Sequence, residues 1–135
     1  MINAKLPLRE CDSMGCGHYG APRGDRTHKG IDFTCPPDYE ICSKIEGEVT
    51  KLGYPYRDAL EFRYVEVTSS DGYRHRYFYV EPLVHVGDFV EEGDVVGKCQ
   101  DVAGHWGGGM KNHVHYEIMV PGNDREWVDP KDYWE

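Results

Sequence analysis

The stretch FRYVEVTSSDGYRHRYFYV, residues 62–80, decides the fold class of the chain. Apolar and polar residues alternate over 62–68, and residues 73–80 form a second run that is rich in aromatic side chains. Alternation with a period of two is typical of a strand with one buried face. The sequence SSDG at 69–72 is a turn signal between the two runs. The stretch therefore predicts an antiparallel β-hairpin.

Shorter strand signals lie on both sides of this hairpin. Residues 30–33 (GIDF), 45–52 and 113–120 (HVHYEIMV) each favour a strand, and a GD-x-V pattern repeats at 87–90 and 93–96. Short turns and strands at this spacing fit an antiparallel meander. An apolar stripe with a 3.6-residue period does not persist for the roughly 11 residues that an amphipathic helix would show. The predicted fold class is mainly β, a compact single domain of antiparallel sheets.

The domain organisation follows from length and local composition. A chain of 135 residues fits one domain around one core. We expect an extended N-terminal loop arm over residues 1–20 and the core over 21–135. Within the core, the glycine-rich segment 103–112 predicts a loop, and 127–134 predicts a polar, aromatic tail.

Charge and hydropathy argue against several classes of partner. The formal net charge is -9, which disfavours nucleic acid and anionic lipid because both need a basic patch. No apolar run approaches the roughly 20 residues that span a bilayer. The first twelve residues, MINAKLPLRECD, lack the apolar segment of a signal peptide, so we expect synthesis in the cytoplasm without a signal peptide. We also expect a monomer.

The chain has five cysteines, and this odd number leaves at least one thiol unpaired in a monomer. Cys11 and Cys16 lie close together in a loop-like stretch, and in an oxidising compartment they could form a local disulfide. A structural zinc site is disfavoured because a CxxC spacing does not occur in the sequence.

Two histidine motifs suggest metal chemistry. His113 and His115 are two residues apart on an expected strand, so both imidazoles face the same way while Val114 faces the other. His28 and Asp32 add an imidazole and a carboxylate at the start of another strand. Two histidines and one carboxylate would hold a tetrahedral zinc ion with one position open, as in catalytic sites. Each motif alone is weak, and histidines on an exposed strand are more often incidental than ligands.

Three segments together resemble one family, the lysostaphin-type (LytM-like) zinc metallopeptidases. They are HKGID at 28–32, the V-x-x-GD-x-V-x-x-GD-x-x-G run at 84–97 and HVHYE at 113–117. The pieces occur in the family's order, and the similarity covers roughly residues 10–132. The resemblance implies a compact β fold, a sheet groove over the metal and cleavage of peptide bonds in peptidoglycan.

The resemblance also implies a role for individual residues. Carried over by matching positions, His28, Asp32 and His115 would bind one Zn²⁺ ion per chain. His113 would be a catalytic histidine that takes and returns a proton. The expected partner is therefore a peptidoglycan peptide.

One position departs from the family's pattern. The family has a second catalytic histidine in a Y-x-H-L strand, and the matching segment here is YFYV at 77–80, so Tyr79 stands where that histidine is expected. The leukocyte cell-derived chemotaxin branch, which is not proteolytic, is similar in having tyrosine there and in the CDxxGCGxY pattern at 11–19. A phenol O–H can donate a hydrogen bond to an oxyanion, so we assign Tyr79 a catalytic role beside His113. His75 is expected on the same strand face but about 13 Å away, too far to substitute.

The functional hypothesis is a zinc-dependent endopeptidase that cleaves peptide cross-links of bacterial peptidoglycan. Without a signal peptide, such a chain would suit a bacteriophage lysis or tail-associated enzyme that acts at the cell wall. The alternative is a catalytically silent, zinc-stabilised module that binds a peptide or receptor. A third hypothesis is a structural β domain with incidental histidines. His18, His85 and His105 are expected at the surface, and the alternative for His105 is that it lines the substrate groove with Trp106.

Overall fold

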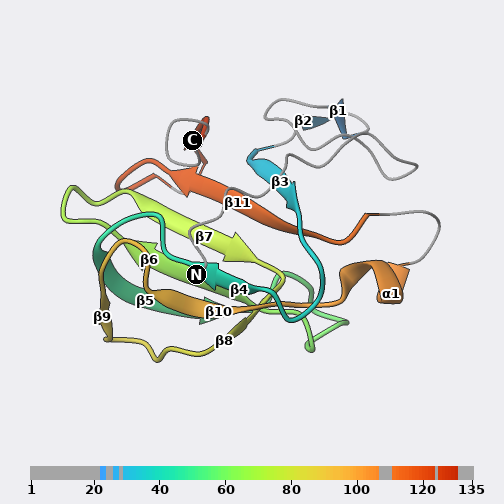
Figure 1. Ribbon diagram of the computed structural model, residues 1–135. Coiled ribbons are helices and arrows are strands. Elements are labelled where there is room, and N and C mark those ends of the chain that lie inside the picture. Colours follow the sequence, from blue (N-terminus) through green and yellow to red (C-terminus); the bar gives the residue numbers. More distant parts are fainter. Residues whose placement is uncertain (1–21, 24–25, 28, 107–110, 124, 131–135) are drawn as a thin grey trace.

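Nearly all of the regular structure in the described residues is antiparallel strand (Figure 1). The computed structural model describes residues 22–23, 26–27, 29–106, 111–123 and 125–130. The strands are β1 (Pro22–Arg23), β2 (Arg26–Thr27), β3 (Ile31–Thr34), β4 (Glu40–Cys42), β5 (Gly47–Gly53), β6 (Tyr64–Thr68), β7 (Arg74–Phe78), β8 (Val80–Pro82), β9 (Phe89–Val90), β10 (Val95–Cys99), β11 (His113–Met119) and β12 (Trp127–Val128), and the helix is α1 (Val102–Trp106). The predicted mainly β fold class is confirmed.

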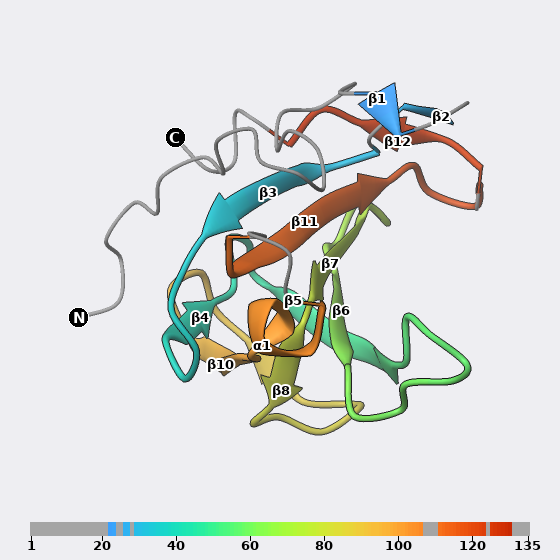
Figure 2. The ribbon, with the colours of Figure 1, turned by 90° about the vertical axis from the view of Figure 1, so that its right-hand side faces the viewer.

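The strands form two main sheets. The larger has the order β12-β11-β7-β6-β5-β9, and β3 pairs with β11 beside this path. The smaller has the order β4-β10-β8, and β1 pairs with β2 separately. Figure 2 shows β3 and β11 side by side, with β4, β10 and β8 on the opposite side of the molecule. This pairing brings a segment near residue 30 against one near residue 115.

The hydrophobic core lies between the two sheets. The larger sheet contributes Val65, Val67 and Tyr77, and the smaller contributes Ile41 and Val96, all 2% exposed or less. Burial of these side chains is the main free-energy gain of folding, since apolar area removed from water stabilises by about 25 cal/mol per Å². The face of the larger sheet that points away from this core therefore remains available for polar groups.

The predicted hairpin is confirmed with slightly different ends. Strands β6 and β7 pair in register from Tyr64 opposite Phe78 to Thr68 opposite Arg74. The turn between them is closed by the Ser69 carbonyl, which accepts from the Gly72 N–H at 2.9 Å, and Gly72 has a φ of +89°. A positive φ is the conformation that glycine adopts without steric cost.

The register of the larger sheet aligns two rows of residues across it. In one row Tyr64, Phe78, His115 and Asp32 are direct neighbours on β6, β7, β11 and β3. In the other, Glu66, Arg76 and Glu117 are direct neighbours on β6, β7 and β11. Directly opposed residues in an antiparallel sheet share a face, so each row is a line of side chains in mutual reach.

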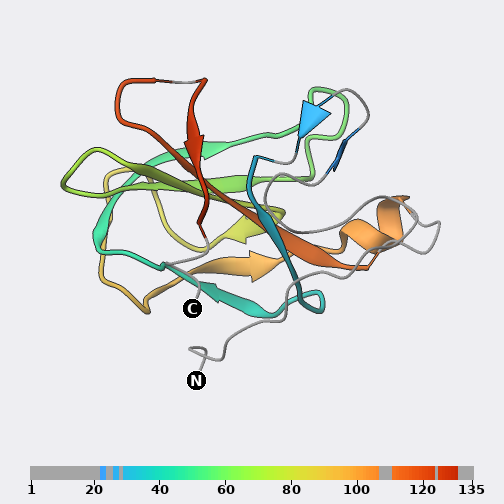
Figure 3. The same cartoon turned by 90° about the horizontal axis from the view of Figure 1, so that it is seen from above.

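The segment expected to be a loop from residue 103 begins instead with α1. Figure 3 shows this helix at the end of the molecule where β11 begins. The Asp101 carboxylate accepts from the Gly104 N–H at 2.8 Å, which is an N-cap bond. The Asn112 side-chain oxygen accepts from the N–H groups of Val102 and Ala103 at 2.8 and 3.0 Å. These bonds satisfy donors that a short helix leaves open, which explains a helical turn without an apolar stripe.

Four expectations concern the ends of the chain, a disulfide and membranes. The arm over 1–20 and the Cys11–Cys16 disulfide lie outside the described residues. In the expected tail, Trp127 and Val128 form β12, which pairs with β11. The described part of the chain contains no helix long and apolar enough to cross a membrane.

Candidate functional site

Asp32 lies between the two histidines of the HVH motif. Its Oδ1 is 2.9 Å from Nδ1 of His115, and its Oδ2 is 3.7 Å from Nε2 of His113. Asp32 is 2% exposed and His113 is 4% exposed. Pairing of β3 with β11 sets this contact, because Asp32 is directly opposite His115 in the register. The structure thus brings together three of the predicted site residues.

The third predicted zinc ligand, His28, lies outside the described residues. Within the described ranges, no group of three or more His, Cys, Asp or Glu side chains is placed to hold a metal ion. The two described ligands still fit a zinc ion by their chemistry and spacing. In a tetrahedral site with bonds of about 2.0–2.1 Å, two ligand atoms are roughly 3.3 Å apart. The 2.9 Å between His115 Nδ1 and Asp32 Oδ1 is close to that separation.

Glu117 is a further carboxylate on the same face. Its Oε1 is 3.0 Å from Nε2 of His115, and its Oε2 is 3.8 Å from the Arg76 guanidinium. Burial would raise the pKa of Glu117, but the hydrogen bond from His115 and the nearby charges outweigh burial and lower it. Glu117 is therefore an ionised carboxylate at neutral pH.

His115 lies between two carboxylates. Burial would lower its pKa, but hydrogen bonds to Asp32 and Glu117 outweigh burial and raise the pKa to about 9. In the protein without a metal, both ring nitrogens of His115 then donate, one to each carboxylate. Such a negative environment is also suited to a divalent cation at one of the two nitrogens.

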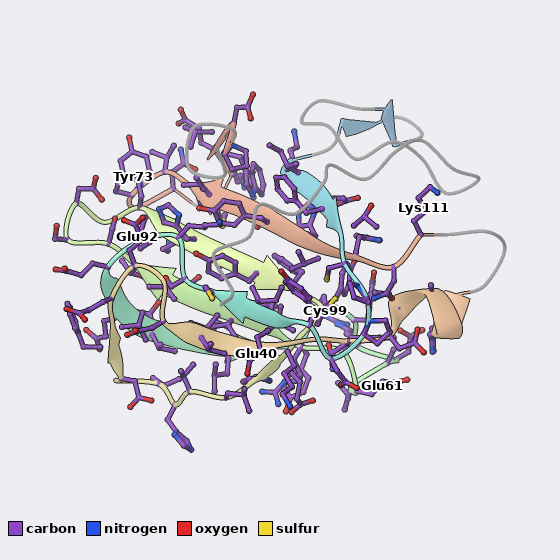
Figure 4. All side chains as sticks on the ribbon, viewed as in Figure 1. Glu40, Glu61, Tyr73, Glu92, Cys99 and Lys111 are labelled. Carbon is purple, nitrogen blue, oxygen red and sulfur yellow. The ribbon has the colours of Figure 1, made fainter. Side chains whose placement is uncertain are left out.

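The His113 ring is oriented by a hydrogen bond to a nearby backbone carbonyl. Its Nδ1 is 2.9 Å from the Lys111 carbonyl, so the Nδ1–H donates to that oxygen. This bond directs Nε2 toward Asp32 and sets which ring nitrogen is available for proton transfer. Figure 4 shows Lys111 at the beginning of β11, at the same end of the molecule as α1.

Tyr79 lies beside His113, the residue with which the sequence analysis grouped it. Its ring is edge-on to the His113 imidazole, with centroids 5.4 Å apart, and its hydroxyl is 2.7 Å from that of Tyr56. Tyr79 has a φ of 68°, in the left-handed region that residues other than glycine rarely adopt. Its N–H donates to the Arg63 carbonyl and its carbonyl accepts from the Gln100 N–H, each at 2.8 Å. These two bonds hold the backbone in its strained conformation.

The expectation that His75 shares a face with Tyr79 is wrong. His75 and Tyr77 point into the core: His75 is 1% exposed, with Nδ1 2.7 Å from the Tyr116 hydroxyl. The left-handed residue ends the strand alternation after Phe78, which turns Tyr79 away from the main core and toward His113 and the smaller core cluster that includes Phe62. His75 is thus a core residue, in agreement with the expectation that it does not substitute for the missing histidine.

Two of the other histidines, His85 and His105, lie in the described part of the chain. The His105 ring contacts Phe62 at 4.9 Å between centroids, and Phe62 in turn contacts Tyr79 at 6.2 Å, so His105 is near the Tyr79 side of the site. His105 is also 3.5 Å from Glu61, which Figure 4 shows at the α1 end of the molecule.

The side chain of His85 is 92% exposed. Trp106 lies at the end of α1, and His18 lies outside the described residues.

Sequence reasoning missed Glu117, Arg76 and Tyr56 as members of the site. Glu117 follows His115 by two residues on the same strand, so period two places it on the histidine face, but the sequence alone assigns it no role. Arg76 depends on the register between β7 and β11, and Tyr56 on the path of a loop. A single sequence does not specify either.

Comparisons with known proteins agree with this fold. Residues 26–130 match Peptidase family M23. Leukocyte cell-derived chemotaxin-2 from Mus musculus is 29% identical over 110 residues, which are 82% of this chain and 72% of that protein.

Two solved structures resemble the chain in fold. The catalytic domain of the antimicrobial peptidase lysostaphin from Staphylococcus simulans has a TM-score of 0.72 at 22% identity, covering 89% of this chain and 90% of that one. The catalytic domain of a prophage-encoded M23 protein, EnpA, from Enterococcus faecalis has a TM-score of 0.67 at 23% identity, covering 94% and 95%.

Proposed function

The chain belongs to peptidase family M23, and from this premise we propose that it is a zinc-dependent endopeptidase that cleaves peptide cross-links of bacterial peptidoglycan. The observation that carries the proposal is the placement of Asp32 between His115 and His113. This arrangement joins a candidate ligand pair to a histidine that is suited to proton transfer. The likeness of the fold to a lysostaphin catalytic domain supports the peptidase class.

In this proposal His28, Asp32 and His115 hold one zinc ion. Zinc bound there would supply Lewis acidity toward the scissile carbonyl. Asp32 is buried and ionisable, and its second oxygen faces His113, so the same carboxylate orients the proton-transfer residue.

His113 acts as general base and then as general acid. Its Nδ1–H bond to the Lys111 carbonyl leaves Nε2 to accept a proton from the attacking water. The same nitrogen then returns the proton to the leaving amine. A positioned acid–base group of this kind contributes about 10²–10⁴-fold to a rate.

Tyr79 donates its hydroxyl hydrogen bond to the oxyanion that forms on the scissile carbonyl. The 5.4 Å between the Tyr79 and His113 rings supports a shared substrate position. Tyrosine does not carry positive charge near pH 7, so it acts here as a neutral donor.

We further propose that the enzyme works at the bacterial cell wall as a phage lysis or tail-associated protein, as a monomer. The likeness to the prophage-encoded EnpA domain supports this role. The net charge of -9 supports a partner other than nucleic acid.

A second candidate function is a zinc-stabilised binding module without catalysis. Tyr79 in place of the expected histidine and the likeness to a protein named as a chemotaxin favour it. The binding module would hold stoichiometric zinc and cleave no wall peptide.

The experiment that separates the two measures release of soluble muropeptides from purified peptidoglycan by zinc-loaded protein. The variants are His113→Ala and Tyr79→His, and His85→Ala, an exposed histidine, is the matched control. We expect release by the wild type and by His85→Ala, and loss of release with retained zinc in His113→Ala. Zinc-loaded wild type that releases nothing from several wall chemistries, with gain of release in Tyr79→His, would instead support the binding module.

A further inference from the structure

Three charged side chains line up on the face of the larger sheet that carries the site. Glu66, Arg76 and Glu117 are direct neighbours on β6, β7 and β11. The Arg76 Nε is 2.8 Å from Glu66 Oε2, and an Arg76 terminal nitrogen is 3.8 Å from Glu117 Oε2. Glu117 Oε1 is in turn 3.0 Å from His115 Nε2. We call Glu66, Arg76 and Glu117 the charge row.

We propose that the charge row positions His115 as a metal ligand: Glu117 binds its Nε2–H, and Arg76, held by Glu66, fixes Glu117. This inference rests on the zinc site of the proposed function and names residues which that site does not include. Glu117 and Arg76 are positioning residues, because they act through His115.

The hydrogen bond to Glu117 decides which nitrogen of His115 meets the metal. With Nε2–H donated to Glu117, Nδ1 is the nitrogen that faces Asp32 Oδ1, at 2.9 Å. Imidazole ligands of metals usually donate the other ring N–H to a carboxylate, a backbone carbonyl or water, which fixes ring orientation and raises ligand basicity. Glu117 is placed to do this for His115.

Arg76 and Glu66 explain why Glu117 can be a fixed, ionised group. A buried carboxylate is costly unless it is paired, and Glu117 is 7% exposed. The Arg76 side chain, 19% exposed, supplies the countercharge to Glu117 Oε2. Glu66, 5% exposed, binds Arg76 at the shorter distance and also accepts from the Thr50 hydroxyl at 2.8 Å. Glu66 on β6, three strands away from β3, therefore holds the end of the charge row that is most distant from Asp32.

The two carboxylate oxygens of Glu117 have different partners, which supports a role in orienting the His115 ring in addition to charge pairing. Oε2 faces Arg76 and Oε1 faces His115, so one carboxylate joins the Arg76 guanidinium to the His115 ring. Truncating Arg76 would remove the partner of Glu117 Oε2 and leave the bond of Oε1 to His115 in place. We therefore expect a graded effect, larger for Glu117 than for Arg76.

The test measures zinc affinity by competition with a chromophoric chelator for wild type, Glu117→Gln, Arg76→Gln and the double variant. Glu48→Gln, an exposed glutamate on β5, and Arg125→Gln, an exposed arginine, are charge-matched controls. We expect about 10–100-fold weaker zinc binding in Glu117→Gln, a smaller loss in Arg76→Gln, and near-wild-type affinity in both controls. In the double variant the Arg76→Gln change should add little, because its effect passes through Glu117.

Two further measurements separate positioning from a purely structural role. The free energy of unfolding without metal, from urea denaturation, reports structural loss in each variant. The Nε2–H proton of His115, observed by NMR in zinc-loaded protein, should exchange slowly with water in wild type and fast in Glu117→Gln. A loss of zinc affinity with this change in exchange is the signature of positioning.

The outcomes are distinguishable. Glu117→Gln that binds zinc as tightly as a zinc-binding wild type would overturn the charge-row inference alone. A zinc loss fully matched by unfolding of the metal-free protein would also overturn it. A wild type that takes up no zinc would overturn the zinc site of the proposed function and, with it, this inference.

Discussion

At position 79 the backbone has a φ of 68°, and the alternation of side chains along β7 stops there. The strained residue is held by the hydrogen bond that its N–H donates to the Arg63 carbonyl and by the one that its carbonyl accepts from the Gln100 N–H, so the rest of the fold determines its conformation. As a result, Tyr79 contacts His113 and Tyr56 and packs against the smaller core cluster of Ala59, Phe62 and Val102 instead of the main core. The contacts of the Tyr79 side chain therefore depend on its backbone conformation more than on its position in the strand.

Replacement of Tyr79 by phenylalanine tests its hydroxyl. If Tyr79 donates to the oxyanion, we expect kcat to fall by about 10²–10³-fold with little change in KM. Initial rates of muropeptide release over a range of peptidoglycan concentrations measure both constants. Tyr54→Phe, at an exposed tyrosine that contacts Arg63, is the control and should keep wild-type rates. An unchanged kcat in Tyr79→Phe would remove the hydroxyl from the mechanism.

His75 predicts a pH dependence of stability that is separate from the metal site. Burial lowers its pKa from 6.5 to about 4, although Asp71 acts in the opposite direction. Because the folded pKa is depressed, the stability linked to neutral His75 is present above pH 6.5 and is lost as the pH falls toward 4. The loss is about 2 kcal/mol at pH 5 and about 3 kcal/mol below pH 4.

Urea denaturation at pH 7 and pH 5, for wild type and His75→Gln, measures this contribution. The change between the two pH values should be about 2 kcal/mol smaller in His75→Gln, since the other histidines titrate in both proteins. Equal changes in the two proteins would show that His75 titrates normally in the folded state.

At the scale of elements, Asn112 ties α1, β10 and β11 together. Its side-chain oxygen accepts from the first N–H groups of α1, and its amide nitrogen donates to the carbonyls of Cys35 and Gln100 at 2.9 and 3.0 Å. It immediately precedes His113. The residue therefore fixes the start of the strand that carries both site histidines.

Asn112→Ala should lower the free energy of unfolding by about 2–4 kcal/mol, since several partly buried hydrogen bonds are lost at once. Urea denaturation measures the change. Asn123→Ala in an exposed turn is the matched control, with an expected loss of less than about 1 kcal/mol. Similar losses in both variants would contradict the junction role of Asn112.

The elements also show what the sequence can and cannot predict. The hairpin of β6 and β7 and the shared face of His113 and His115 follow from period two, which is a local property. The helix α1 does not, because its first turn is satisfied by Asn112 from another segment. The row from Glu66 to Glu117 depends on the register of three strands, and the position of Tyr79 depends on a backbone strain that long-range contacts impose.

At the scale of the whole molecule, zinc binding should be linked to folding. A ligand that binds only the folded state stabilises it by about 2.7 kcal/mol at a concentration 100 times its Kd, which corresponds to a rise of roughly 10 °C in Tm for a domain of this size. Thermal unfolding followed by circular dichroism, with zinc and after chelation, measures the rise. Asp32→Ala should abolish it, and Asp58→Ala, at an exposed aspartate, should keep it. A zinc response that persists in Asp32→Ala would contradict the ligand assignment.

The pairing of β3 with β11 has a consequence for every preparation of the protein. Ile31 and Phe33 are buried in the core on one side of β3, and Asp32 faces His115 on the other. A slip of one residue in this pairing would exchange the two faces, placing a carboxylate in the core and an apolar side chain opposite His115. Each molecule would then have either the complete site or no site. Titration of active sites would therefore count the correctly aligned molecules.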